Sequence, residues 1–254
     1  MIYDEVMVHR STLARLSEIA EDQWGLVTRR QAHNAGVSRA TFQRLASGGV
    51  LDRVARGVYR LSGSPVPDQL ELRAAWLQLA PDVPAWRRSV DEGVVSHRSA
   101  ANVYGLGHLP ADRHEFTMAS RRQTRRPDVR LHRRQLRDGE WISFRGLPVT
   151  RPSRIASDLL FANEDPEAVG HVIADAIRGG YDYPGSFAAS LAPHAARFGL
   201  RRNSGINLLS WLLALVDDPD TDRWLEEARG HSARVELAER EDLLRGPAEE
   251  GRDR

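Results

Sequence analysis

The feature that most constrains the fold near the start of this chain is a pair of short helical segments joined by a glycine turn. Thr28 is a typical N-cap for a helix over residues 29–35, and Gly36 supplies the positive φ that a tight turn needs. Ser38 then caps a second helix over residues 39–47. Because two helices joined by a short glycine turn form a helix-turn-helix, we expect that motif here.

A short hairpin is expected directly after the second helix. Residues 50–54 and 58–61 are strand-like, and Gly57 lies in the short turn between them. A further helix is expected upstream, with apolar residues at helical spacing from Ser11, a plausible N-cap. The order of helix, helix, turn, helix and hairpin predicts a winged helix-turn-helix over residues 1–62.

The second helix of the motif has one face suited to DNA. At 100° per residue Phe42 and Leu45 point inward, whereas Gln43 and Arg44 point the opposite way. Arginine pairs with guanine and glutamine with adenine in the major groove. The candidate DNA-binding residues lie on this face, at the helix starts and on the hairpin: Thr28, Arg29, Arg30, Ser38, Arg39, Ala40, Gln43, Arg44, Ser47, Arg53, Arg56 and Arg60.

The charge is nearly balanced overall but unevenly placed. The net charge is +1, and all 36 basic residues are arginine, which excludes P-loops and lysine-dependent nuclease centres. Residues 24–62 hold seven arginines against one acid, Asp52, and residues 113–154 hold twelve against four. Such zones indicate polyanionic partners. The arginine cluster within residues 121–126 fits phosphate, an acidic partner or a solvated loop equally well.

No catalytic, metal-binding or cofactor-binding motif is found. The absence of cysteine excludes disulfides and thiolate chemistry and fits a reducing compartment. Residues 1–10 do not form a signal peptide, and the apolar stretch 206–216 falls short of the roughly 20 residues that cross a bilayer. That stretch predicts a buried helix.

His97 is a catalytic base, a nucleic-acid contact or, more typically, a structural residue. We therefore expect a cytoplasmic, non-enzymatic protein that needs no cofactor or metal and does not enter membranes.

The rest of the chain predicts a second, larger domain. Residues 63–68 hold a glycine, a serine and two prolines, a composition typical of turns, and form the expected linker. Helical and strand-like segments then alternate irregularly, and helices dominate the end of the domain over residues 69–245. Residues 246–254 are expected to fray. The predicted fold class is α+β: an N-terminal winged helix-turn-helix followed by a larger mixed α/β domain with a helical C-terminus.

Several segments resemble a known family. Residues 25–32, 36–38 and 51–61 are similar to the winged-helix portion of AbiEi-type antitoxins of type IV toxin–antitoxin systems, and Arg56-Gly57-Val58-Tyr59 is the most specific piece. The resemblance extends through motifs that follow the winged helix in that family: residues 96–101, 104–106 and 146–154. Very-short-patch-repair-like endonucleases share much of this middle segment, so it does not decide function.

The resemblance implies an antitoxin that is also a transcriptional autorepressor. Such a protein binds inverted repeats in the double-stranded DNA of its own promoter. It also opposes a cognate AbiEii-like nucleotidyltransferase toxin, without requiring a stable complex. Two alternatives stay open. One is a free-standing winged-helix transcription factor with a ligand-sensing or dimerisation domain. The other is a nuclease using Asp158 or Asp175, although the chain lacks the lysine of such centres.

Overall fold

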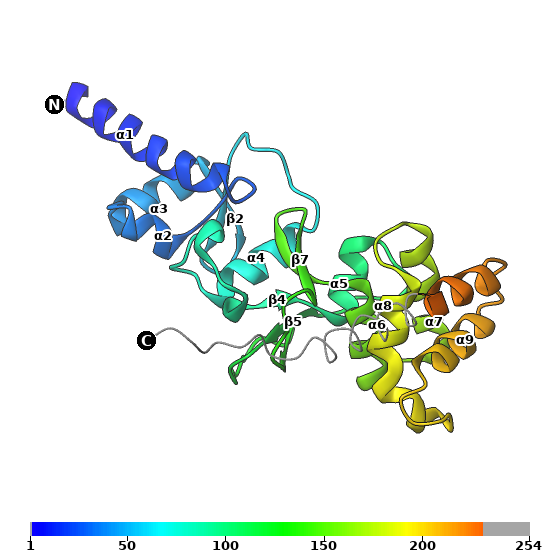
Figure 1. Ribbon diagram of the computed structural model, residues 1–254. Helices are drawn as coiled ribbons and strands as arrows, with labels where there is room; N and C mark the ends of the chain where they lie inside the picture. Colours follow the sequence, from blue (N-terminus) through cyan, green and yellow to red (C-terminus); the bar gives the residue numbers. More distant parts are fainter. Residues whose placement is uncertain (1, 231–254) are drawn as a thin grey trace, which may run out of the picture. The chain divides into compact units, whose positions relative to one another are not determined.

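The computed structural model describes the backbone of residues 2–230 and the side chains of residues 12–230 (Figure 1). Its first elements are α1 (Ile2–Glu21), β1 (Leu26–Thr28), α2 (Arg29–Asn34), α3 (Arg39–Ser47), β2 (Leu51–Ala55) and β3 (Val58–Leu61). This is the predicted order of a winged helix-turn-helix. The predicted start of α1 at Ser11 is wrong: the helix begins at Ile2. The residues before Ser11 contain no glycine or proline, so nothing in them interrupts the helix.

The strands of this segment form a small antiparallel sheet in the order β1-β3-β2. Ala55 pairs with Val58, so only Arg56 and Gly57 form the turn of the hairpin. Gly57 has a φ of +78°, a conformation that a residue with a Cβ rarely adopts. The register shifts between Arg53 and Ala55, which twists the hairpin locally.

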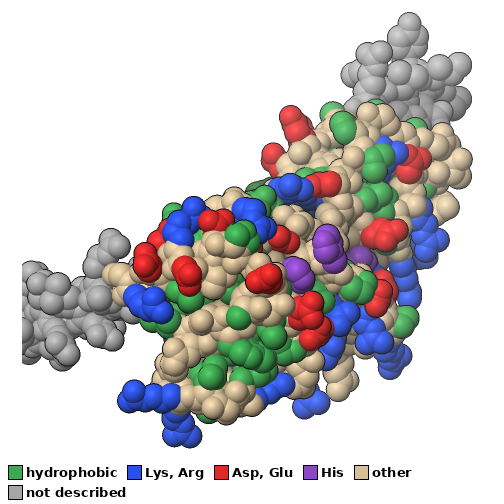
Figure 2. Space-filling model, turned by 90° about the vertical axis from the view of Figure 1, so that its right-hand side faces the viewer, with side chains coloured by type: hydrophobic (Ala, Val, Ile, Leu, Met, Phe, Trp, Pro, Cys, Tyr) green, Lys and Arg blue, Asp and Glu red, His purple; other side chains and the backbone are tan. Residues whose placement is uncertain are grey.

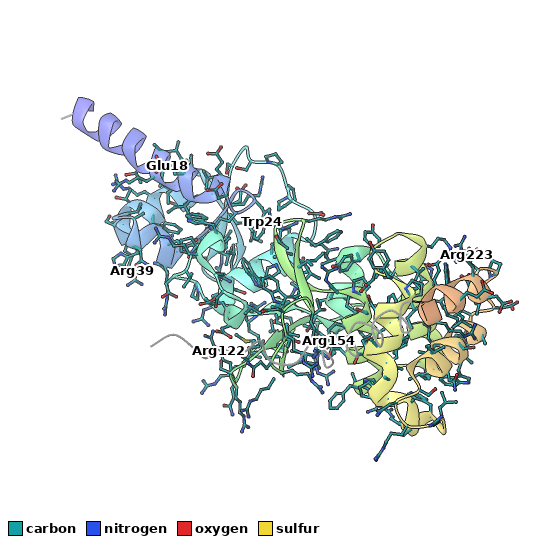
Figure 3. The ribbon with its side chains drawn as sticks, viewed as in Figure 1. Glu18, Trp24, Arg39, Arg122, Arg154 and Arg223 are labelled. Atoms are coloured by element: carbon teal, nitrogen blue, oxygen red, sulfur yellow. The ribbon has the colours of Figure 1, made fainter. Side chains whose placement is uncertain are left out.

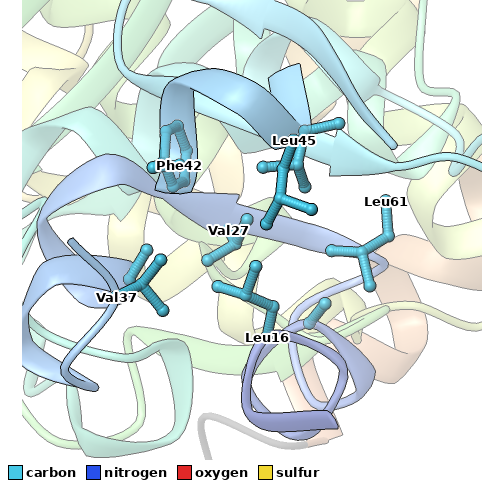
Figure 4. Close-up of a cluster of buried hydrophobic side chains, with 9 residues drawn as sticks. Leu16, Val27, Val37, Phe42, Leu45 and Leu61 are labelled. Carbon is cyan, nitrogen blue, oxygen red and sulfur yellow. The ribbon is translucent and has the colours of Figure 1, made fainter. Parts of the chain in front are cut away.

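A hydrophobic cluster holds these elements together (Figure 4). Leu16 of α1 and Val27 of β1 are fully buried, and Val37 of the turn is 3% exposed. Phe42 and Leu45 of α3 complete the cluster from the opposite side, at 2% and 8% exposed. Burying each large apolar side chain stabilises the fold by about 1.5–3 kcal/mol. The inward face predicted for α3 is therefore confirmed.

A second sheet follows, built from short strands: β4 (Val94–Val95), β5 (His114–Met118), β6 (Val129–Arg133), β7 (Trp141–Phe144) and β8 (Leu147–Thr150). The strand order is β6-β5-β4-β8-β7. The pairs β4–β5 and β7–β8 are antiparallel, whereas β5–β6 and β4–β8 are parallel. The elements that precede or interrupt this sheet are α4 (Leu70–Leu79), η1 (Ala85–Arg87), η2 (Val90–Glu92) and α5 (His97–Tyr104). The predicted mixed α/β organisation is confirmed.

The remaining described elements are helical: α6 (Pro152–Phe161), α7 (Pro166–Arg178), α8 (Pro184–Leu191), η3 (Ala192–Phe198) and α9 (Gly205–Leu215). Residues 221–230 are also helical. Proline begins α6, α7 and α8, where its missing N–H leaves no bond unmade. One face of α9 is buried, through Leu208, Leu209, Leu212 and Leu213. Trp211 and Leu215 are 36% and 40% exposed, so the burial predicted for residues 206–216 holds for that face only. A helical C-terminal region is thus confirmed.

The chain divides into two compact units at a different place from the predicted linker. One unit holds residues 1–103 and 111–150, and the other holds residues 104–110 and those from 151 onward. The winged helix and the second sheet therefore belong to one unit. The functional division into a DNA-binding and an antitoxin domain remains a prediction.

Contacts from α4 and the loop after it explain why residues 63–68 do not separate the chain. The Arg73 guanidinium lies over the Trp24 ring, and Gln78 Nε2 donates to the Arg56 carbonyl at 2.7 Å. Further along, the Ala85 amide donates to Gln23 Oε1 at 3.2 Å. These bonds hold α4 and its loop against the winged helix, so the predicted linker only connects two parts of the same packed unit.

Two of the predictions concern residues beyond 230. The helical stretch up to residue 245 and the frayed tail over residues 246–254 lie outside the described residues. Among the helices that are described, none combines the length and the apolar character that crossing a membrane requires.

Candidate nucleic-acid interface

Helix α3 presents a regular, capped scaffold for a recognition face. Ser38 Oγ accepts from the Thr41 amide at 3.1 Å and so satisfies one of the unpaired N–H groups at the helix start. Phe42 and Leu45 fix the inward face. The residues on the opposite face are all exposed: Ala40, Gln43, Arg44 and Ser47. Figure 3 labels Arg39 at the first position of this helix.

The exposed face of α3 carries the hydrogen-bonding groups that base edges require. The Gln43 amide both donates and accepts, which matches adenine, and the Arg44 guanidinium offers a fork of donors that matches guanine. Ser47 is tied to its own helix, since its hydroxyl donates to the Gln43 carbonyl at 2.9 Å. Ser47 is therefore a short side chain on this face whose hydroxyl proton is already used within the helix.

A hollow of about 500 Å³ lies beside this face, between α2 and α3. The guanidinium-bearing side chains of Arg29, Arg30 and Arg39 line it, with Asp82 the one carboxylate of its lining. Arginine forks in this position are well suited to the phosphates that flank a helix in the major groove. His33 and Asn34 also line it, and sequence reasoning missed both; their place in the last turn of α2, just before the turn glycine, was the available signal.

The hairpin contributes two exposed arginines and a third whose guanidinium is bound to neighbouring groups of the chain. Arg53 and Arg56 are exposed. Arg60 is only 19% exposed, and its Nη2 lies 2.8 Å from Asp52 Oδ2 while Nη1 donates to the Ser64 carbonyl. The Arg60 guanidinium therefore braces the hairpin, because the strand register places Asp52 directly opposite Arg60, and the DNA contact of Arg60 stays a prediction.

The structure corrects the prediction that Thr28 contacts DNA. Its side chain is fully buried, its Oγ1 accepts from the Gln31 amide at 3.0 Å, and the same hydroxyl donates to the Pro81 carbonyl. The Gln31 side chain in turn accepts from the Thr28 amide at 2.9 Å, completing a capping box. Thr28 therefore starts α2 as predicted, but the loop after α4 covers it and no phosphate can reach it.

The local charge of residues 24–62 remains strongly positive when the pairing of Arg60 with Asp52 is taken into account. Asp52, the single acid of residues 24–62, is paired with Arg60, which leaves the other arginines of that segment to set its charge. Over the whole chain the charges nearly cancel, and acidic and basic side chains are interspersed on the face drawn in Figure 2. The positive charge is therefore concentrated in particular segments of the chain and is not a property of the molecule's net charge.

The carboxylates considered for nuclease chemistry serve structural bonds. Asp158 lies on α6, is 3% exposed and accepts from Arg154 Nε at 2.9 Å. Asp175 accepts from the Gly107 amide at 2.9 Å and from Arg178 at 3.2 Å. Among the described residues, no group of three or more histidine, aspartate or glutamate side chains is arranged to hold a metal ion.

One comparison with known proteins bears on this site. Residues 14–62, from α1 to the end of the hairpin, match the family model described as "Transcriptional regulator, AbiEi antitoxin". The resemblance predicted for the winged-helix segment is thereby confirmed, and a transcriptional regulator or antitoxin is the kind of protein it indicates. A search of curated proteins found no match. The match ends at residue 62, so the resemblance predicted for the later segments stays a prediction.

Proposed function

We propose that this chain binds the double-stranded DNA of its own promoter and represses transcription. One observation carries the proposal: Gln43 and Arg44 are exposed on the outer face of a capped helix, next to a hairpin whose Arg53 and Arg56 are also exposed. In this proposal α3 enters the major groove and reads bases. The hairpin and the arginines beside α2 hold the flanking phosphates.

The proposal includes an antitoxin role for the rest of the chain. The family description names an antitoxin, and the predicted resemblance beyond residue 62 implies a nucleotidyltransferase toxin as its target. Opposing that toxin needs neither an enzyme activity nor a stable complex. Both activities belong in the cytoplasm, where promoter DNA and such a toxin meet.

Fluorescence anisotropy with labelled DNA from upstream of the gene tests the repressor role. We expect binding at least about a thousandfold tighter than to a scrambled duplex, because base contacts add to phosphate contacts. The logarithm of the affinity should fall steeply and linearly with the logarithm of salt concentration, as counterions are released. Equal affinity for the scrambled duplex would contradict sequence-specific repression.

Co-expression with the neighbouring toxin gene tests the antitoxin role. The full chain is the right reagent, because α4 packs on the winged helix and a cut in the linker would expose both. A chain carrying Arg44→Ala and Arg56→Ala should lose repression yet still restore growth. Continued growth arrest with the folded variant would contradict the antitoxin role while leaving DNA binding untouched.

A free-standing regulator that senses a ligand is the second candidate. A basic pocket in the same unit as the winged helix favours it. Two findings would favour this ligand-sensing role over the antitoxin role. One is that no nucleotidyltransferase gene lies beside the gene for this chain, and the other is a ligand that changes the affinity of the chain for the promoter.

A further inference from the structure

A pocket lies at the edge of the second sheet where two parallel strands end. β5 and β6 are parallel and in register from His114 and Val129 to Met118 and Arg133, so their carboxyl ends meet at one edge. The segment 119–128 crosses over between them. Ligands in parallel sheets bind preferentially at this edge, outside the carboxyl ends of the strands.

The pocket has a volume of about 400 Å³ and a lining rich in hydrogen-bond donors. These come from the crossover segment and from the end of β6: Ser120, Arg121, Arg122, Gln123, His132 and Arg133. A volume of this size falls within the range of small-molecule sites. No carboxylate belongs to the lining, so its charge is positive.

The arginine side chains of the pocket form no ion pairs with acidic residues among those that the structure describes. Within the part of the chain that is described, the side chains of Arg121 and Arg133 make no hydrogen bond or ion pair. Arg122, labelled in Figure 3, donates to the Leu79 carbonyl at 3.0 Å, which anchors it at the end of α4. The single acid of the crossover segment, Asp128, is paired with Arg126. Guanidinium groups brought together in this way repel one another unless an anion lies between them.

His132 is held in one orientation beside the pocket. Its Nε2 lies 3.1 Å from Glu115 Oε1, and its ring stacks on His97 with centroids 3.5 Å apart. His97 has a φ of +54°, a strained conformation for a residue with a Cβ, and its Nδ1 lies 3.0 Å from Ser96 Oγ. The Arg98 amide donates to Glu115 Oε2 at 3.0 Å.

These contacts distinguish the pocket from a solvated basic loop. Burial would raise the pKa of Glu115, but the hydrogen bond with His132 and the charges of His97 and His132 outweigh it and hold that pKa below its usual value. The pocket thus borders a polar network that these contacts hold in place, and its arginine side chains are exposed.

We propose that this pocket binds a phosphate-bearing ligand of the diphosphate class. Guanidinium groups bind phosphate oxygens through paired N–H donors, and three of them match a diphosphate better than a single monoanion. The Ser120 hydroxyl and the Gln123 amide add neutral donors. The diphosphate comes either from a free small molecule or from successive phosphates of a nucleic-acid strand.

Titration calorimetry of the full chain with sodium pyrophosphate tests the proposal. We expect one site per chain, with affinity at least about tenfold weaker in the Arg121→Gln/Arg133→Gln variant. The control is Arg125→Gln/Arg137→Gln, which removes the same charge from two exposed arginines outside the pocket and should bind within about twofold of wild type. Both variants change exposed residues, so circular dichroism should show wild-type folding.

A second titration separates the two sources of phosphate. A short single-stranded oligonucleotide replaces pyrophosphate, in the Arg44→Ala/Arg56→Ala background that disables the proposed promoter contacts. Oligonucleotide binding that is lost with Arg121 and Arg133, without pyrophosphate binding, assigns the pocket to a strand. Pyrophosphate binding assigns it to a free ligand. If neither probe binds, or if the control variant weakens binding as much as the pocket variant, the proposal is overturned, whatever the promoter experiment shows.

Discussion

Arg73 lies over the ring of Trp24, with its guanidinium carbon 4.4 Å from the ring centroid. Trp24 meets Trp76 edge-on at 5.9 Å between centroids, and Arg88 lies over the other tryptophan at 4.2 Å. Arg73 is 2% exposed, and it donates to Asp68 Oδ1 at 2.8 Å. This stack joins α4 to the winged helix, so we expect the segment proposed to read DNA to depend on the rest of its unit for stability.

Replacing Arg73 with methionine tests that dependence. Arg73→Met keeps most of the side-chain volume but loses the charge over Trp24 and the bonds to Asp68 and the Arg145 carbonyl. We expect the free energy of unfolding to fall by about 2 kcal/mol, measured by urea denaturation. Arg87→Met, an exposed arginine on η1, is the control and should stay within about 0.5 kcal/mol of wild type. Equal stability of the two variants would show that the stack contributes nothing.

Thr28→Val separates helix capping from DNA contact. The substitution keeps the shape of the side chain but removes the cap to Gln31 and the bond to the Pro81 carbonyl, so stability should fall by about 1–2 kcal/mol. DNA affinity, measured well below the melting temperature, should not change because Thr28 is buried. A loss of affinity at unchanged stability would restore Thr28 as a DNA contact. Ser38→Ala, at an exposed cap, is expected to reduce both.

The local elements of the winged helix were predictable because their signals are local. Thr28 and Ser38 cap helices as expected, and Gly57 turns the hairpin at a positive φ. The outward direction of Gln43 and Arg44 followed from helical periodicity alone. Each of these features depends on residues fewer than five positions apart, so no knowledge of tertiary packing was needed.

Long-range contacts account for what sequence reasoning missed. The pairing of Arg60 with Asp52 becomes visible only once the strand register is known. The cover over Thr28 comes from Pro81, 53 residues away, and the junction with Trp24 comes from Arg73. Polar side chains that pack through hydrogen bonds and cation–π contacts leave no hydrophobic periodicity in the sequence, so the sequence does not reveal that residues on both sides of 63–68 pack into one compact unit.

Gly205→Ala tests the close packing of α8 and α9. A Cβ at Gly205 would lie 1.8 Å from the Ala188 carbonyl oxygen, a backbone atom that cannot turn aside. The two helices must move apart, so we expect a loss of about 2–3 kcal/mol and a lower melting temperature. Asn207→Ala, an exposed position on α9, is the control and should melt close to wild type. An unchanged melting temperature for Gly205→Ala would refute this packing.

The bonds of Glu115 predict how stability depends on pH. Its folded pKa lies below the unfolded value, so its contribution is complete above the usual glutamate pKa of about 4.3 and is lost as pH falls through the folded pKa. Glu115→Gln should therefore be less stable than wild type at neutral pH, and the gap should close in acid. Urea midpoints between about pH 3 and pH 7 measure it. Glu18→Gln, on the exposed side of α1, should track wild type, and a Glu115→Gln gap that widens in acid would reverse the sign of this account.

The promoter affinity of Arg44→Ala, compared with Arg87→Ala, decides whether α3 reads DNA. Both variants remove one exposed arginine from the same unit, so they change the net charge equally. Losing a bidentate base contact should weaken binding to the upstream DNA by about 1–3 kcal/mol, with much less effect on a scrambled duplex. Arg87→Ala should leave both affinities almost unchanged. If Arg44→Ala binds the upstream DNA as tightly as Arg87→Ala does, α3 is not the recognition helix.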